Sequence, residues 1–107
     1  MKHVLFVCSQ NKLRSPTAEQ VFADFPGVST DSAGTNHDAV NELTEEHILW
    51  ADLIFVMETT HRQKVSRKFG HLLKGQRLIC LDIPDNYGLM DEALIALLKR
   101  KVTPFLV

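Results

Sequence analysis

Four short apolar runs alternate with amphipathic segments along this chain, and this alternation limits the folds that it can adopt. The runs are rich in Val, Ile, Leu and Phe, which is typical of strands that are buried in a parallel sheet. Between them lie segments whose apolar residues recur at helical spacing. The runs are Val4–Val7, Val28–Ala33, Leu53–Met57 and Leu78–Leu81. The order β-α-β-α-β-α-β-α predicts a doubly wound α/β layer around a parallel sheet.

The amphipathic segments predict four helices, each with its own apolar stripe. We expect the first helix to begin at Ser15, with Pro16 in the first helical position, and to end before Pro26-Gly27. A capping box of Thr60 with Gln63 opens the third helix, which Gly70 either ends or carries near its end. Basic residues 99–101 are expected near the C-terminal end of the fourth helix, as its dipole prefers. The stripes are Ala18, Val21, Phe22 and Phe25; Val40, Leu43, His47 and Trp50; Val65, Phe69 and Leu72; and Met90, Ala93, Leu94, Leu97 and Leu98.

Length, charge and cysteine content restrict the classes of protein further. The 107 residues fit a single domain, residues 1–107, and an apolar content of 45% is enough for a core. A net charge of −1 gives no global field for nucleic acid or a membrane, and no apolar run approaches the length of a membrane span. The N-terminal apolar run is too short for a signal peptide, so the two cysteines indicate free thiols in the cytoplasm. The oligomeric state stays open.

The candidate functional loop follows the first apolar run. Five residues separate the thiol of Cys8 from the guanidinium of Arg14, in the sequence CSQNKLRSPT of residues 8–17. A strand, a short loop and a helix N-terminus form an anion cradle, because free backbone N–H groups point into it. A cysteine at its base is a nucleophile aimed at the bound anion, and an arginine can grip two phosphate oxygens. In such sheets ligands bind at the carboxyl ends of the strands, which is where Cys8 falls.

This loop resembles the Cys-x5-Arg-Ser-Pro loop of the low-molecular-weight protein tyrosine phosphatases. Three further segments resemble family motifs in the same order: Ser32-Ala33-Gly34-Thr35, the third apolar run ending in Met57-Glu58, and Asp85-Asn86-Tyr87. The resemblance covers most of the chain. It implies a four-stranded parallel sheet with helices on both faces, the phosphotyrosine phosphatase I-like fold. It also implies cysteine-dependent hydrolysis of phosphotyrosine or aryl phosphates, from a protein or a small molecule, without a cofactor.

The resemblance also implies roles for single residues. Cys8 attacks phosphorus and forms a phosphocysteine, Arg14 stabilises the transition state, and Asp85 is the general acid, with Asp82 as its competitor. Ser15 donates its hydroxyl to the thiolate or caps the helix, Asn11 ties the loop, and Ser32 braces it from the second strand. Tyr87 stacks on an aromatic substrate or packs on the protein. The expected substrate-binding residues are Ser9, Gln10, Asn11, Lys12, Leu13, Ser15 and Tyr87.

The chain departs from the family pattern at four places. Gln10 replaces a glycine, so a positive φ there would strain it, and otherwise its amide faces the mouth. Lys12 adds charge at the rim, where the family often has isoleucine. Leu13 stands where a second loop cysteine is common, so oxidised Cys8 has no local resolving thiol. The segment after Thr35 is short, which predicts an open, shallow pocket and leaves phosphotyrosine selectivity undecided.

Other functions use similar loops. Arsenate reduction needs further cysteines, and only Cys80 is available, in a predicted buried strand. A phosphocysteine carrier has no need of Arg14, and Asp85 would then lack a purpose. A catalytically weak phosphate-binding or regulatory module is a further alternative, which Gln10 and the short segment keep open. The histidines at 37, 47, 61 and 71 are scattered over separate segments, so we expect no metal site, and His47 is expected to be partly buried in packing.

Overall fold

A computed structural model describes all residues, 1–107. Its sheet consists of four parallel strands in the order β2-β1-β3-β4, which confirms the predicted doubly wound α/β fold. The strands are β1 (Lys2–Cys8), β2 (Val28–Gly34), β3 (Leu53–Val56) and β4 (Arg77–Cys80). The helices are α1 (Arg14–Phe22), α2 (Glu45–Trp50), α3 (Thr59–Phe69) and α4 (Glu92–Leu106), and a 3-10 turn, η1, spans Gly70–Leu72.

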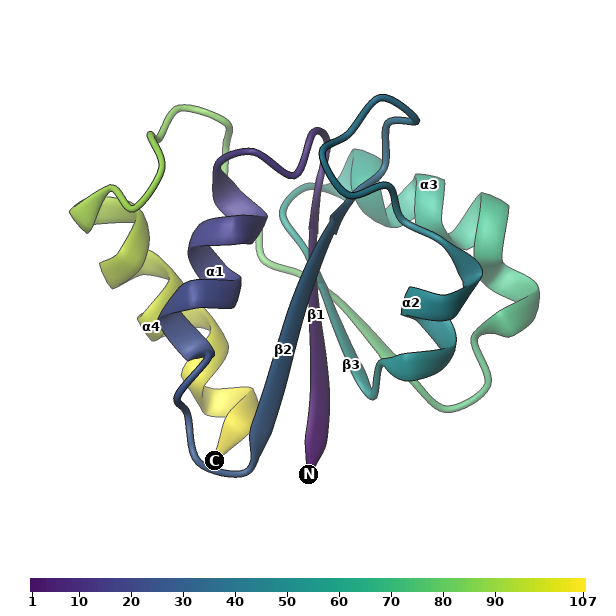
Figure 1. Cartoon of the computed structure of the whole chain (residues 1–107), viewed down its shortest axis with the longest axis horizontal. Coiled ribbons are helices and arrows are strands. Elements are labelled where there is room, and N and C mark those ends of the chain that lie inside the picture. The colour runs from purple at the N-terminus through teal and green to yellow at the C-terminus, as the bar shows by residue number, and fades with distance from the viewer.

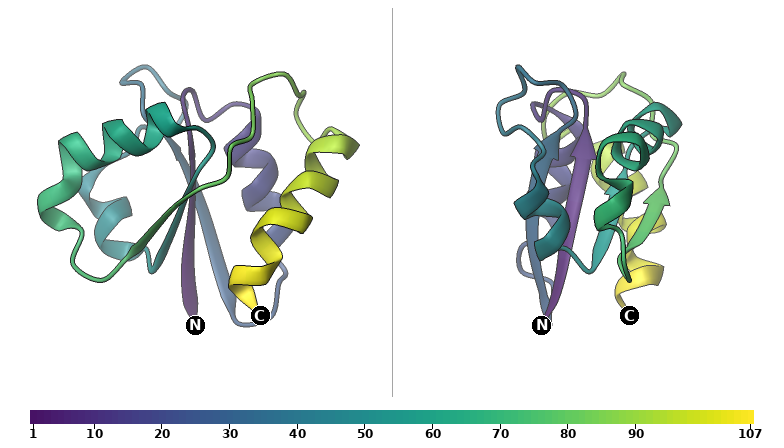
Figure 2. Two further views of the ribbon diagram at one scale, coloured as in Figure 1. Left: turned by 180° about the vertical axis from the view of Figure 1, so that it is seen from behind. Right: turned by 90° about the vertical axis from the view of Figure 1, so that its right-hand side faces the viewer.

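Helices cover both faces of the sheet. In Figure 1, α1 and α4 lie on one side of the strands and α2 and α3 on the other, and Figure 2 shows the same layers from behind and from the side. Alternate residues of β1 therefore enter two cores. Val4, Phe6 and Cys8 belong to the core under α1 and α4, whereas Leu5 and Val7 belong to the core under α2 and α3. Residues 4–8 of β1 and all of β3 are buried, which explains why these central strands are continuous apolar runs.

The first helix begins one residue before the predicted cap. Leu13 is the N-cap, so Ser15 lies inside the first turn and the prediction that it caps the helix is wrong. Its hydroxyl instead contacts the sulfur of Cys8. Pro16 consequently occupies the third helical position, where its missing N–H costs little because the first four helical N–H groups have no partner within the helix.

The predicted second helix begins too early. Val40 is 71% exposed, and α2 starts only at Glu45. Leu43 is buried because the segment before it pairs with the end of β2: Gly34 bridges to Glu42, and the Leu43 amide donates to the Gly34 carbonyl. His47 is partly buried, as predicted, and its Nδ1 accepts from the Thr44 amide at 3.0 Å, so it also caps the helix.

The ends of the third and fourth helices also differ from the predictions. The capping pair of α3 is Glu58 with His61, not Thr60 with Gln63. Gly70 ends α3 and opens the 3-10 turn. Helix α4 continues to Leu106, so the basic residues 99–101 lie in its middle. The helix extends because Val102 is fully buried and Phe105 packs against the core, and this burial outweighs the preference of cations for a helix end. No helix has both the length and the apolar character that crossing a membrane requires.

Candidate active site

The loop between β1 and α1 encloses Cys8 at the carboxyl edge of the sheet. The cysteine is 3% exposed, and its Sγ lies 3.0 Å from the Ser15 Oγ. None of the backbone N–H groups of residues 9–13 donates a hydrogen bond within the protein. A row of unpaired amides above a cysteine, at the start of a helix, is an arrangement that binds anions.

Asn11 holds the loop in shape. Its φ is 57°, in the left-handed region, and its Nδ2 donates to the Ser15 Oγ and the Ser32 Oγ, each at 2.9 Å. Asparagine is one of the few residues that adopt this region at low cost. Gln10 does not have a positive φ. The substitution of glycine by Gln10 is therefore unstrained, and its side chain lines the pocket over Cys8.

Gly34, at the end of β2, allows the neighbouring segment to approach the loop. A Cβ at this position would lie 2.6 Å from the Ser9 carbonyl oxygen and 2.5 Å from the Ala39 Cβ. Hydrogen bonds join the two segments: the amides of Thr35, Asn36 and Val40 donate to the carbonyls of residues 8, 9 and 10 at 2.9 to 3.0 Å. The glycine of the Ser-Ala-Gly-Thr motif is thus required by close packing against the loop.

Arg14 is buried beside the loop and is held by acidic partners. Its Nη1 donates to the Glu58 Oε2 at 2.6 Å and to the Ile83 carbonyl at 2.7 Å. Its Nε lies 3.7 Å from the Asp85 Oδ1. Nε and Nη2 donate no hydrogen bond within the protein, so one edge of the guanidinium keeps two free donors. Two parallel donors match two oxygens of a phosphate.

His61 links the start of α3 to the loop. The Glu58 amide donates to its Nδ1 at 3.0 Å, so the proton of the neutral ring is on Nε2, which donates to the Ser9 Oγ at 2.8 Å. Burial, together with the nearby positive charge of Arg14, lowers the pKa of His61 from 6.5 to about 4. The ring is therefore a neutral donor at neutral pH.

Asp85 and Asp82 line two different hollows. Asp85 lines the pocket over Cys8, and its side chain is 63% exposed. Asp82 has a φ of 54° and lines a different hollow, where its carboxylate lies 3.4 Å from the Cys80 Sγ. The pocket over the cysteine has a volume of about 120 Å³. It is lined by Cys8, Ser9, Gln10, Lys12, Leu13, Arg14 and Asp85.

The remaining predicted residues lie outside this pocket. Asn11, Ser15 and Ser32 are buried, and their side chains form one hydrogen-bonded network. Tyr87 packs against the core under α1 and α4 and does not line the pocket, which matches the packing alternative of the prediction. No group of three or more His, Cys, Asp or Glu side chains lies close enough together to hold a metal ion.

Sequence reasoning missed the positions of Glu58 and His61. Glu58 was noted only as part of a motif, and His61 only as one of several scattered histidines. A usable signal existed, because Glu58 follows β3 closely and so lies at the same edge of the sheet as Cys8. His61 follows one helical turn later.

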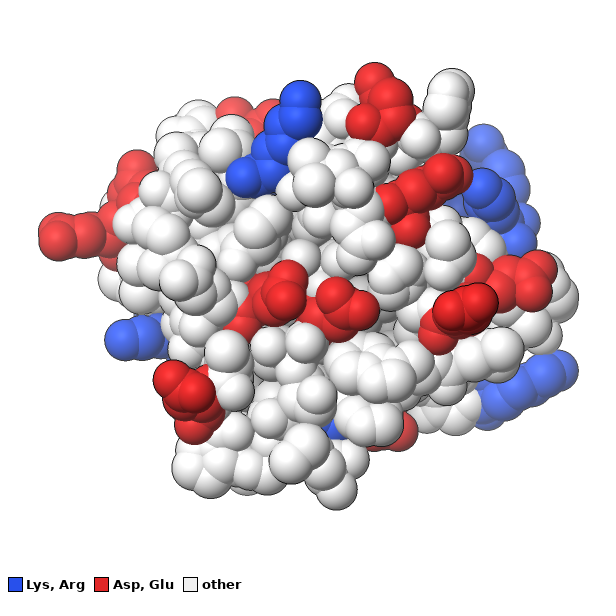
Figure 3. All heavy atoms as spheres, viewed as in Figure 1, with Lys and Arg blue, Asp and Glu red and all other residues white.

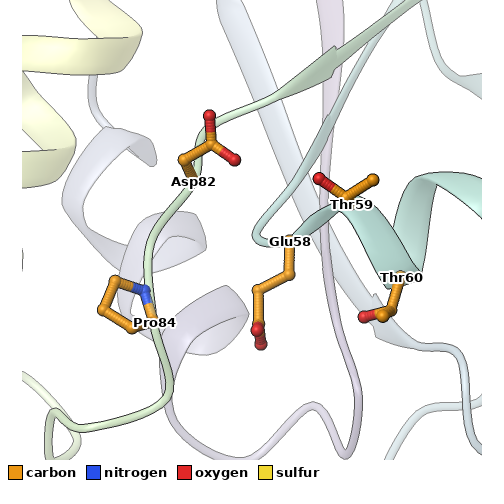
Figure 4. Close-up of a pocket in the computed structure, with 5 residues that line it drawn as sticks. All are labelled: Glu58, Thr59, Thr60, Asp82 and Pro84. Carbon is orange, nitrogen blue, oxygen red and sulfur yellow. The ribbon is translucent and has the colours of Figure 1, made fainter.

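A second hollow adjoins the first (Figure 4). It has a volume of about 320 Å³ and lies between the start of α3 and the segment after β4, with Glu58, Thr59 and Thr60 on one side and Asp82 and Pro84 on the other. It contains no aromatic side chain and has two carboxylates. Because Asp85 lines the first pocket and Pro84 the second, the two hollows share this wall.

Solved structures with the same fold cover nearly the whole chain. YwlE arginine phosphatase from Geobacillus stearothermophilus is 24% identical, with a TM-score of 0.73 over 96% of this chain and 87% of that one. The tyrosine phosphatase Wzb from Escherichia coli K30, in complex with phosphate, is 22% identical, with a TM-score of 0.70 over 97% and 95%. A YwlE variant with a phosphorylated active-site serine is 25% identical, with a TM-score of 0.73 over 97% and 95%.

These similarities show that the chain has the same fold as these phosphatases. Residues 3–49, which contain the loop and β2, match the sequence profile of the family described as low molecular weight phosphotyrosine protein phosphatase. The match covers less than half of the chain. A search of curated protein sequences finds no significant match.

Proposed function

We propose that the chain hydrolyses phosphate monoesters through a phosphocysteine at Cys8, with phosphotyrosine or another aryl phosphate as substrate. The observation that carries this proposal is the set of unpaired loop amides above a buried cysteine, with the free edge of Arg14 at the same pocket. Together they offer donors for the three non-bridging oxygens of a phosphate and a sulfur nucleophile below it.

In the first step the Cys8 thiolate attacks phosphorus, and an S–P bond forms as the bond from phosphorus to the leaving oxygen breaks. The leaving oxygen takes a proton from Asp85. In the second step water attacks the phosphocysteine, Asp85 accepts a proton from that water, and the S–P bond breaks to release phosphate and the thiolate. The YwlE variant with a phosphorylated active-site serine supports a covalent intermediate of this kind.

Ser15 contacts the sulfur of Cys8 directly, and Asn11 is linked to it through Ser15. The Ser15 hydroxyl lies 3.0 Å from Sγ and can donate to the thiolate in both steps. The Asn11 Nδ2 donates to the same Ser15 oxygen, which leaves the hydroxyl proton free to point at the sulfur. We assign Ser15 and Asn11 as positioning residues, with Ser32 as the anchor of the network on β2.

Asp85 is the better candidate for the general acid. It lies at the pocket over the cysteine, whereas Asp82 lies in the adjoining hollow beside Cys80. Its exposed carboxylate can exchange protons with water between the two steps.

A phosphorylated guanidinium is a second candidate substrate. The hollow that adjoins the pocket is polar, has two carboxylates and contains no aromatic ring, so it suits a cationic leaving group better than a phenol. Tyr87, which could have stacked on a tyrosyl ring, packs against the core instead. The similarity to an arginine phosphatase supports this candidate. With this substrate the bond that breaks is P–N, and Asp85 protonates the nitrogen.

The test is turnover of three substrates: p-nitrophenyl phosphate, a phosphotyrosine peptide and a phosphoarginine peptide. Cys8→Ser is expected to abolish hydrolysis of all three. Asp85→Ala is expected to slow the phosphotyrosine peptide more than p-nitrophenyl phosphate, because a good leaving group needs less protonation. Phosphate binding without turnover in the unmodified protein would instead indicate a binding module.

Two other functions have less support. Arsenate reduction requires Cys80 to exchange disulfides with Cys8, and the two residues lie in opposite cores of the sheet. A phosphocysteine carrier does not explain the buried Arg14 or Asp85 at the same pocket.

Both cysteines are free thiols, which supports a reducing compartment such as the cytoplasm as the place of action.

A further inference from the structure

One stretch of the chain, residues 59–81, carries positive charge only. It contains six of the twelve Lys and Arg residues and none of the thirteen Asp and Glu residues. Its formal charge is therefore +6, and the rest of the chain carries −7. All six basic side chains are exposed; they are Arg62, Lys64, Arg67, Lys68, Lys74 and Arg77. In Figure 3 basic side chains gather along the right-hand edge, over α3 and the segment after it, whereas acidic side chains dominate the front face.

The protein itself does not neutralise these cations. The three ion pairs of the structure involve Arg14 and His47, and none involves residues 59–81 as a cation. The dipole of α3 favours the basic residues Arg67 and Lys68 in its last turn. It disfavours Arg62 and Lys64, which lie in the first half of the helix. Arg62 donates to the Leu78 carbonyl and Arg77 lies over the Phe105 ring, but no acidic side chain within the fold balances the positive charge of this stretch.

The basic helix begins at the active site. Thr59 and Thr60 line the hollow that adjoins the cysteine pocket, and His61 contacts the loop through the Ser9 hydroxyl. The Lys64 Nζ lies 3.3 Å from the Asn36 Oδ1, and the Asn36 amide donates to the Ser9 carbonyl. Lys64 is thus one residue removed from the phosphate-binding loop.

The orientation of α3 fixes which cations a bound chain would meet. His61, Val65 and Phe69 face the sheet, so Lys64 and Lys68 lie along one flank, next to Thr35 and Leu43 of the segment that braces the loop. One helical turn separates the two lysines by about 6 Å. An extended peptide advances about 3.3 Å per residue, so two residues of a bound peptide span the spacing between the two lysines.

We propose that Lys64, Arg67 and Lys68 form a docking surface for an acidic segment that flanks the phosphorylated residue of a protein substrate. This inference rests on the proposed phosphatase function and adds the substrate feature that the enzyme selects. Charge complementarity at such a surface raises the rate at which the substrate meets the protein. This electrostatic attraction weakens as the salt concentration rises.

A protein segment fits this surface better than a nucleic acid or a membrane does. Binding of single-stranded nucleic acid commonly uses aromatic side chains for base stacking, and the one aromatic ring of α3, Phe69, is 5% exposed. A helix that lies on a membrane needs an exposed apolar face, and Val65 and Phe69 are buried in the core.

The test compares three peptides with the same central phosphotyrosine: three Glu on the N-terminal side, three Glu on the C-terminal side, and Gln on both sides. We expect one acidic peptide to have a kcat/KM about 10-fold above that of the Gln peptide at low salt, and the difference to fall to about 2-fold in concentrated NaCl. Arg67→Gln/Lys68→Gln is expected to remove the preference. Lys99→Gln/Arg100→Gln, which removes the same charge from an exposed part of α4, is expected to keep it.

Fluorescence anisotropy of the same peptides on Cys8→Ser protein separates this inference from the proposed function. Tighter binding of one acidic peptide, lost in the background of the α3 double variant, supports docking even if the unmodified protein hydrolyses nothing. Equal binding and equal rates for all three peptides overturn the docking surface even if p-nitrophenyl phosphate is hydrolysed. Displacement of the acidic peptide by polyuridylate or phosphatidylserine vesicles at lower concentration than by unlabelled peptide also overturns it.

Discussion

At the scale of single residues, the site depends on side chains whose hydrogen-bonding partners are fixed by their burial. Cys8 and Arg14 were identified from the sequence because their spacing and the strand before them are local properties. Glu58 and His61 were not, because their contacts with Arg14 and Ser9 span 44 and 52 residues. A pattern within one segment carries no information on partners at that separation.

Arg14→Lys tests whether the geometry of the guanidinium matters beyond its charge. A lysine keeps the charge but cannot bond Glu58 and Ile83 while presenting two parallel donors to a phosphate. We expect kcat/KM on p-nitrophenyl phosphate to fall by about 10² to 10³, the usual cost of losing a transition-state donor. A variant with the unfolding midpoint of the unmodified protein and a loss of less than about 3-fold would contradict this role for the guanidinium.

The lowered pKa of His61 predicts that the stability of the protein depends on pH. Its folded pKa, about 4, lies below the unfolded value of 6.5, so the unfolded chain binds more protons between these values. Stability is therefore lower at pH 4 than at pH 7, by roughly 1 to 3 kcal/mol from this residue. Urea unfolding across this range measures the change. His61→Gln cannot titrate, and the same loss of stability in that variant would exclude His61 as the source.

At the scale of elements, the strands were predictable and the helix ends were not. A strand buried on both faces is a continuous apolar run, and this signal is independent of its neighbours. Helix α2 was predicted too early because Leu43, which fits its stripe, is buried by pairing with Gly34 instead. Helix α4 was predicted too short because Val102 and Phe105 are held by tertiary packing.

A substitution at Gly34 tests whether close packing between the end of β2 and the loop over Cys8 matters. Gly34→Ala places a Cβ against the Ser9 carbonyl, whose backbone is part of the loop over Cys8. We expect a loss of about 2 kcal/mol in the free energy of unfolding and a fall in kcat/KM of about 10-fold or more, since overpacking displaces the loop. Chemical denaturation and p-nitrophenyl phosphate kinetics measure the two effects.

Gly75→Ala is the matched control for this variant. Gly75 has no positive φ, and a Cβ there would meet no atom within 4 Å. We expect its stability and its kinetics to stay close to those of the unmodified protein. Equal effects of the two substitutions would show that the close approach at Gly34 does not hold the loop.

At the scale of the whole molecule, the sheet separates the two thiols. Cys8 ends β1 and belongs to the core under α1 and α4, whereas Cys80 ends β4 and packs on the other core. Strand β3 lies between their strands. Two strand spacings amount to about 9.6 Å, which exceeds the Cα separation that a disulfide allows. The sequence predicted from Leu13 that no resolving cysteine lies in the loop. Only the structure shows that Cys80 packs on the other face of the sheet.

This separation predicts how the enzyme responds to peroxide. Oxidised Cys8 cannot be trapped as an intramolecular disulfide with Cys80, so it proceeds to the sulfinic acid more readily than in a protein with a resolving thiol. Mass spectrometry after brief exposure to peroxide should show Cys8 carrying two oxygens and no peptide that joins the two cysteines. Cys80→Ser should lose activity at the same rate as the unmodified protein. A disulfide between Cys8 and Cys80, or inactivation that dithiothreitol reverses in full only when Cys80 is present, would require one strand to leave the sheet and would overturn the topology on which this prediction depends.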